Sequence, residues 1–128
     1  MGCDLKEEKE SFSKMPFKEC EFTILDSEYE VKRVEMPKAF NGLFIDGDKI
    51  PKGAIIRAKG DGDIFTKFGG GTKKLVDYFT DKKIPLRLRA NIPVIAIDNE
   101  ILAIFGVEVS EKVRVDKNTK VVYQLIKK

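Results

Sequence analysis

Short apolar runs, each stopped by turn-forming residues, are the feature that most restricts how this 128-residue chain can fold. Residues 94–97 and 101–105 are separated only by Asp98-Asn99-Glu100, which predicts a buried hairpin. Upstream, apolar and polar residues alternate in 21–25 and 29–35 around Asp26-Ser27. A period of two residues is that of a half-buried strand, so a second hairpin is expected there. Most of the fold should therefore be built from strands.

The other predicted elements complete a β-rich α+β domain of about eight strands and two short helices. Further strands are expected at 43–45, 54–59, 107–109, 113–115 and 121–126. Thr72 is predicted to cap a first helix that buries Leu75, Val76 and Phe79, and Pro85 to open a second helix that runs to about residue 91. Aromatic and apolar residues of the core are expected to include Phe65, Phe68, Leu75, Tyr78, Phe79 and Phe105. Residues 1–18 are interpreted as a flexible N-terminal arm or a stretch left by cloning, and 19–128 as one domain.

The available side-chain chemistry excludes most catalytic arrangements. Histidine is absent and the only cysteines are Cys3 and Cys20, which rules out histidine-based triads and the usual zinc sites. Two reduced thiols are expected rather than a disulfide. No apolar run approaches the ~20 residues that span a bilayer, and the first residues fit neither a secretory signal nor a myristoylation site. We therefore expect a cytoplasmic domain that is not catalytic alone and holds no cofactor or metal.

Positive charge is concentrated between residues 57 and 93, where nine basic side chains accompany four acidic ones in a chain of net charge +3. This segment includes a run of glycines, one threonine and two lysines: Gly69, Gly70, Gly71, Thr72, Lys73 and Lys74. A glycine loop that leads into a helix N-terminus beside lysines can hold phosphate with its amide and ammonium groups. In the alternative interpretation, the glycines serve only a loop that needs positive φ angles. The spacing fits neither a Walker A loop nor a dinucleotide fingerprint.

The remaining basic side chains of this segment allow two interpretations. They include Arg57, Lys59, Lys82, Lys83, Arg87 and Arg89. They would contact phosphates on an RNA-binding face, or they would be solvated side chains of the two helices. For Arg89 a structural role, tying the second helix to Asp63 or Asp81, is weighed equally with RNA contact. The aspartate pairs at 46/48 and 61/63 are interpreted as turn residues and not as metal ligands.

Several separated blocks follow one another in a distinctive order. They are Ile45-Asp46-Gly47-Asp48-Lys49-Ile50, Ile56-Arg57-Ala58-Lys59 with Gly62-Asp63, Gly71-Thr72-Lys73-Lys74-Leu75, Leu88-Arg89 with Ile92-Pro93, and Gly106. Together they resemble the C-terminal domain of bacterial tRNA(Ile)-lysidine synthetase, well over about residues 40–128 and loosely over 20–40. Two residues depart from the family's pattern: Ile64 stands where many relatives carry arginine, and Glu108 stands where a basic residue is common.

This resemblance implies a layered β-sandwich related to a domain of the phenylalanyl-tRNA synthetase β-chain. In the family, a separate N-terminal domain with an S-G-G-x-D-S motif joins lysine to the wobble cytidine of tRNA(Ile). That ATP-dependent ligase reaction passes through an adenylated intermediate. Because this chain lacks the motif, ATP and Mg²⁺ are implied for a catalytic domain outside it, and the chain would be a C-terminal fragment or a free-standing copy. The C-terminal domain is implied to hold the tRNA acceptor stem.

Two hypotheses from different classes follow. In the first, a tRNA-binding domain contacts acceptor-stem phosphates through Lys73, Lys74, Lys82, Lys83, Arg87, Arg57 and Lys59, with the glycine loop as a phosphate cradle. Its partners would be tRNA(Ile) and the upstream catalytic domain. Double-stranded RNA is the expected target, because aromatic and basic residues do not alternate in the manner that stacks single-stranded bases. In the second, the domain braces neighbouring domains or forms a homodimer, and an exposed apolar patch is expected instead.

Overall fold

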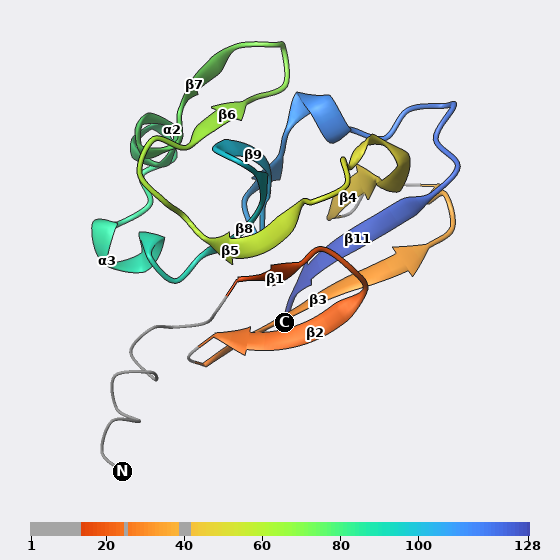
Figure 1. The fold of residues 1–128 in the computed structure, drawn as a ribbon, viewed down its shortest axis with the longest axis horizontal. Coiled ribbons are helices and arrows are strands. Elements are labelled where there is room, and N and C mark those ends of the chain that lie inside the picture. Colours follow the sequence, from red (N-terminus) through yellow and green to blue (C-terminus); the bar gives the residue numbers. More distant parts are fainter. Residues whose placement is uncertain (1–13, 25, 39–41) are drawn as a thin grey trace.

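Two β-sheets dominate the computed structural model, which describes residues 14–24, 26–38 and 42–128 (Figure 1). Sheet A contains β1 (Met15–Pro16), β5 (Ile55–Ala58), β6 (Ile64–Thr66), β7 (Thr72–Lys74), β8 (Pro93–Ile97), β9 (Glu100–Ile104) and β10 (Glu108–Val109). Sheet B contains β2 (Cys20–Ile24), β3 (Ser27–Val34), β4 (Leu43–Asp46) and β11 (Val122–Lys127). The helical elements are α2 (Leu75–Asp81), α3 (Leu86–Arg89) and the 3₁₀ turns η1 (Gly47–Lys49) and η2 (Glu111–Val113).

Sheet A forms the middle layer of the molecule. Its strand order is β1-β5-β8-β9-β6-β7, with β10 also paired to β9, whereas sheet B has the order β2-β3-β11-β4. Successive residues of a strand point to opposite faces, so on β8 Ile95 joins the core shared with sheet B while Val94 joins the core beneath α2. A β-bulge makes Leu102 an extra residue on β9, because Ile95 pairs with Ala103 and the next pair joins Ala96 to Ile101. The result is a sheet B, sheet A and helix layering.

Most of the predicted strands are confirmed. The alternating segments form the antiparallel β2–β3 hairpin, although Leu25 lies outside the described residues, and the apolar pair forms the β8–β9 hairpin. The strand predicted at 113–115 is wrong, because Ser110 accepts a hydrogen bond from the amide of Lys112 through Oγ at 3.1 Å and caps the 3₁₀ turn η2 instead. Strands β6 and β7 were not predicted, since β6 is only three residues long and pairs in parallel with β9, far along the chain.

The helix boundaries differ from the prediction in one consequential way. Residues 72–74 form strand β7, and the first helix begins at Leu75. The Thr72 hydroxyl does not cap that helix, because it bonds across the hairpin to the Thr66 hydroxyl at 2.8 Å. Leu75, Tyr78 and Phe79 are buried as predicted, but Val76 is 42% exposed, so the prediction that Val76 faces the core is wrong. The second helix spans only Leu86–Arg89.

Phe68 departs from the predicted core, since 46% of its surface is exposed. At the N-terminal end, Met15–Pro16 pairs with β5 as strand β1 inside the predicted arm. The rest of that arm up to residue 13, including Cys3, lies outside the described residues. Among the residues that the structure describes, no helix is both long enough and apolar enough to cross a membrane.

Candidate nucleic-acid interface

The three consecutive glycines lie in the turn of the β6–β7 hairpin. Lys67 donates its amide to the Gly71 carbonyl at 2.9 Å, and the Gly70 amide donates to the Lys67 carbonyl at 3.0 Å. Gly69 and Gly70 have φ angles of +97° and +91°, a backbone conformation that side chains disfavour. The first amide of α2, that of Leu75, donates to the Asp63 carbonyl at 2.9 Å. The prediction that these glycines lead directly into a helix N-terminus is therefore wrong, because strand β7 separates them from α2 and the first amide of α2 already has a partner.

Lys73 and Lys74 lie on opposite faces of sheet A. Lys73 pairs in register with Phe65, whose side chain is in the core beneath α2, and its ammonium group forms an ion pair with Asp81 of that helix. Lys74 pairs in register with Ile64, and both side chains are exposed on the other face. The two lysines therefore cannot hold a single phosphate together. Ile64 therefore accompanies Lys74 on this second face.

Lys73 forms an ion pair with the Asp81 carboxylate, and Lys67 and Lys82 lie near enough to act on it electrostatically. The pKa of Asp81 lies below its ordinary value, first because Lys73 donates a hydrogen bond to it and then because Lys73, Lys67 and Lys82 bring positive charge close. The Asp81 side chain is 56% exposed. We call Lys67, Lys73 and Lys82 the lysine cluster. Its surplus of two positive charges over the single carboxylate is available to an anionic ligand.

Lys67 was not among the predicted site residues. Its sequence neighbours contain the signal that would have found it, since a Gly-Gly turn between two threonine-containing segments indicates a hairpin. The hairpin folds the second strand back along the first. It therefore brings Lys73 on the second strand close to Lys67 at the start of the turn. The lysine cluster therefore depends on the pairing of β6 with β7. The prediction that Lys73 and Lys74 belong to a helix contains no such pairing, so it could not place Lys67 beside Lys73.

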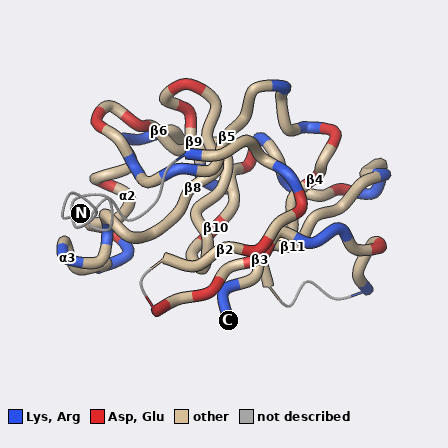
Figure 2. Tube along the Cα trace, turned by 60° about the horizontal axis from the view of Figure 1, so that its bottom comes forward, with Lys and Arg blue, Asp and Glu red and all other residues tan. Residues whose placement is uncertain are grey.

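Lys82, Lys83 and Arg87 extend the basic surface from α2 to α3. Lys82 is the C-terminal cap of α2 and places Nζ 5.5 Å from the centre of the Tyr78 ring. Lys83 follows with a φ angle of +59°, and both Lys83 and Arg87 are exposed. Cations near a helix C-terminus also interact favourably with the helix dipole. Figure 2 shows basic positions gathered at α3 and the adjoining end of α2, whereas acidic positions follow the β2–β3 hairpin.

Arg57 belongs to a buried hydrogen-bonded constellation. Its Nη1 and Nη2 donate to the two carboxylate oxygens of Asp63 at 3.0 and 2.9 Å, and Nη2 also donates to the Asp98 carbonyl at 3.0 Å. Asp63 accepts a further hydrogen bond from the Gly60 amide at 2.7 Å. The Arg57 and Asp63 side chains are 17% and 1% exposed. Arg57 thus joins strand β5 to the loop before β6 and to the β8–β9 turn, and Lys59, two residues further, is half-buried.

Arg89 is also engaged inside the fold. Its Nε donates to the Ile84 carbonyl at 2.9 Å, Nη2 donates to the Thr80 hydroxyl at 3.4 Å, and the guanidinium lies 5.7 Å from the centre of the Phe79 ring. The residue is 9% exposed. Arg89 therefore ties α3 to α2, although its partners are neither of the aspartates that the sequence suggested.

The interpretation of Asp46 and Asp63 as turn residues agrees with their contacts. Asp46 accepts a hydrogen bond from the Asp48 amide at 2.8 Å and caps η1. The other carboxylate oxygen of Asp46 accepts a hydrogen bond from the Thr119 hydroxyl at 2.8 Å, which links β4 to the loop before β11. Asp63 fixes its own loop through Gly60, as described above. These carboxylates are consumed by backbone and side-chain bonds of the fold.

Comparison with known proteins assigns this chain to a family. Residues 55–125 match the family model described as the TilS substrate C-terminal domain. The tRNA(Ile)-lysidine synthase of Caldanaerobacter subterraneus is 47% identical over 77 residues, which are 59% of this chain and 16% of that protein. The enzyme of the same name from Clostridium tetani is 44% identical over 92 residues, which are 71% of this chain and 20% of that protein. The chain thus spans no more than 20% of the length of these two relatives.

A crystal structure of a TilS C-terminal domain has the same fold. It superposes with a TM-score of 0.66 at 24% sequence identity, covering 80% of this chain and 83% of that one. This similarity confirms the expected layered β-sandwich with two short helices.

Proposed function

The chain belongs to the family of TilS substrate C-terminal domains, and we propose that it docks tRNA for a tRNA(Ile)-lysidine synthase by holding acceptor-stem phosphates. The complete enzyme would attach lysine to the wobble cytidine of tRNA(Ile). ATP and Mg²⁺ would act in its catalytic domain, which is a partner of this domain and not a part of it. The domain described here would contribute binding and orientation without chemistry of its own.

The lysine cluster is the observation that supports this proposal. An exposed ion pair contributes only about 0–1 kcal/mol to stability, so folding gains little by bringing three lysines to one carboxylate. Lys67, Lys73 and Lys82 nevertheless converge on Asp81 from the hairpin turn, strand β7 and the end of α2. The phosphates of double-stranded RNA form a regular array that a group of cations on separate elements can match.

The other predicted residues take different places in the proposal. Lys83 and Arg87 extend the cluster along α3. The glycine turn at 69–71, followed by Thr72, would approach the RNA backbone at the tip of the hairpin. The space around this tip is open, since a Cβ atom at Gly69 or Gly70 would meet nothing within 4 Å. Lys74 lies on the opposite face of sheet A, so it would contact a different part of the RNA, and we leave Lys59 as a peripheral contact. We assign Arg57 and Arg89 to the fold, because their donors are already used within it.

The salt dependence of tRNA binding tests the proposal. If about four phosphates of a duplex are neutralised, log K should fall with log salt concentration at a slope of about −3.5. Replacing Lys73 and Lys82 together by alanine should weaken binding and flatten that slope by roughly one to two units. The matched control replaces Lys117 and Lys120, which are exposed. They belong to the loop before β11, which lies on the opposite side of the view from α2 and α3 (Figure 1). An unchanged slope in the Lys73 and Lys82 variant, or an equal loss in the control, would remove the cluster from the interface.

A second candidate function rests on a separate observation, which is the exposure of apolar side chains on α2 and α3. Leu86 is 79% exposed, Leu88 is 46% exposed, and Val76 on the neighbouring helix is 42% exposed. Such a surface suits packing against another domain or a second copy of the chain. Two results together would favour this packing role over RNA docking. The first is concentration-dependent association in size-exclusion experiments that Leu86→Ser abolishes. The second is tRNA binding whose affinity does not change with salt concentration.

A further inference from the structure

We propose that a pocket beside the β6–β7 hairpin accepts one unpaired nucleobase of the bound RNA, stacked on Phe68. This inference rests on the proposed tRNA-docking function and adds a base-contacting site to it. The pocket has a volume of about 280 Å³ and is lined by Gly42, Leu43, Phe44, Phe68, Glu108, Val109, Arg114 and Val115. Pockets for drug-sized ligands begin at about 300 Å³, so this one suits a smaller planar group.

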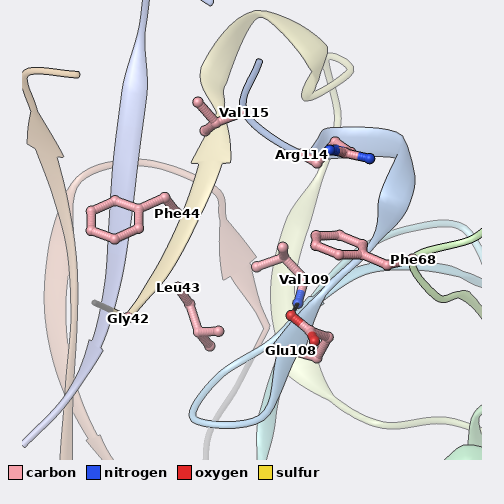
Figure 3. A pocket seen from close by; sticks show the side chains of 8 residues that line it. All are labelled: Gly42, Leu43, Phe44, Phe68, Glu108, Val109, Arg114 and Val115. Atoms are coloured by element: carbon pink, nitrogen blue, oxygen red, sulfur yellow. Dashed lines mark hydrogen bonds between the residues drawn. The ribbon is translucent and has the colours of Figure 1, made fainter. Parts of the chain in front are cut away.

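One wall of the pocket is a half-exposed aromatic ring that is already paired with a guanidinium. Phe68 is 46% exposed, and the Arg114 guanidinium lies 5.2 Å from the centre of its ring. Figure 3 shows these two side chains on one side of the pocket and the β4 residues Leu43 and Phe44 on the other. A half-exposed phenylalanine at a hairpin tip gains nothing for the core, whereas aromatic rings and arginine planes are the groups on which proteins stack unpaired bases.

The same hairpin connects this pocket to the lysine cluster. Phe68 directly follows Lys67 in the turn, and β7 carries Lys73 a few residues later. Backbone phosphates held by the cluster would therefore bring neighbouring nucleotides to the pocket. A base leaves its duplex stack only at a cost, which an already unpaired nucleotide does not incur. This continuity favours an unpaired base at a duplex end over a base inside the stem.

Glu108 supplies a hydrogen-bond acceptor to the pocket. One of its carboxylate oxygens accepts a bond from the Val109 amide at 3.0 Å, and a carboxylate has further acceptor capacity. Amino groups of bases, such as N4 of cytosine, donate to carboxylates, whereas uracil offers a carbonyl at the corresponding position. Glu108 would thus favour cytosine over uracil.

The test compares a short blunt RNA duplex with the same duplex carrying one unpaired terminal cytidine. Wild-type protein should bind the duplex with the overhang roughly five- to tenfold more tightly than the blunt duplex. This factor is at the low end of the range for stacking of a base on an aromatic ring, because Arg114 already covers one face of Phe68. Phe68→Ala should abolish that difference and leave blunt binding unchanged, whereas Phe68→Trp should keep it. Leu86→Ala is the matched control, since it also removes an exposed apolar side chain but lies outside the pocket.

Two further measurements separate the possible failures. Exchanging the unpaired cytidine for uridine should lower the overhang advantage, and Glu108→Gln should reduce that discrimination. Cytidine monophosphate should shift the NMR signals of Phe68 and Arg114 in the wild-type protein. Salt-sensitive binding of blunt duplex without an overhang advantage or such shifts would overturn the pocket assignment alone. Absence of all duplex binding would overturn the docking function, and the pocket assignment with it.

Discussion

Replacing Asp63 by asparagine should destabilise the fold while leaving the RNA-binding surface intact. The carboxylate accepts two hydrogen bonds from Arg57 and one from the Gly60 amide, all between 2.7 and 3.0 Å, and its side chain is 1% exposed. Asparagine has nearly the same shape but only one acceptor oxygen, and it turns an amino group toward existing donors. The substitution therefore leaves the Arg57 charge without its counterion in a mostly buried setting.

The expected magnitude follows from the exposure of the two partners. Breaking a buried ion pair by removing one member costs about 3–5 kcal/mol. Arg57 is 17% exposed and keeps its bonds to the Ala58 and Asp98 carbonyls, so the low end, about 3 kcal/mol, applies. With a urea m-value of about 1.5 kcal/mol/M for a domain of this size, the unfolding midpoint should fall by about 2 M.

Urea unfolding followed by circular dichroism measures this shift. Asp61→Asn, in the same loop but exposed, is the matched control and should change stability by less than about 0.5 kcal/mol. A double-mutant cycle with Arg57→Gln should give a coupling of about 1–3 kcal/mol. An Asp63→Asn midpoint close to that of the wild type would refute the structural role assigned to the pair. A loss of tRNA affinity in Arg57→Gln, measured under conditions where this variant is fully folded, would also refute that role.

Two other predictions concern ionisable groups. Asp81→Asn removes the anion that competes for the lysine cluster, so RNA should bind about two- to threefold more tightly. NMR titration of the wild type should place the pKa of Asp81 below its ordinary value of 3.8, and in Lys73→Ala that pKa should lie nearer to 3.8. Weaker RNA binding by Asp81→Asn would contradict the proposed role of the cluster. Burial, followed by the nearby charge of Glu108, raises the pKa of Tyr78 from 10.0 to about 12, so the stability from its neutral phenol is complete below pH 10 and is lost as pH rises through about 12. Alkaline unfolding should lack this component in Tyr78→Phe, and ionisation of Tyr78 near pH 10 in the folded protein would count against it.

Local patterns predicted those elements whose partners are close in the sequence. The β2–β3 and β8–β9 hairpins followed from alternation and from a two- or three-residue turn signal, because each strand pairs with the next. Strand β7 could not be found in this way. Thr72, Lys73 and Lys74 have no strand-like alternation of their own, and they are extended only because β6 offers them a paired edge.

The same limit applied to the candidate site. The concentration of basic residues between 57 and 93 was visible in the sequence, but their division into structural and exposed groups was not. Arg57 is held by Asp63, six residues away across a loop, and Arg89 is held by the Ile84 carbonyl in the loop between α2 and α3. Lys67 joins the cluster only because the hairpin returns it to Lys73 and Asp81.

The amino-acid sequence by itself determined the β-rich class, the order of the main strands, the family and the segment that carries the positive charge. These properties depend on composition, on the period of two residues, and on short-range turns. Only the tertiary structure decided which cations share a surface, because strand pairing sends adjacent lysines to opposite faces and brings distant ones to the same carboxylate. The tertiary structure also places exposed Phe68 beside Arg114. Phe68 lies in the β6–β7 turn and Arg114 directly follows η2, and the local sequence of one segment does not predict its contact with the other.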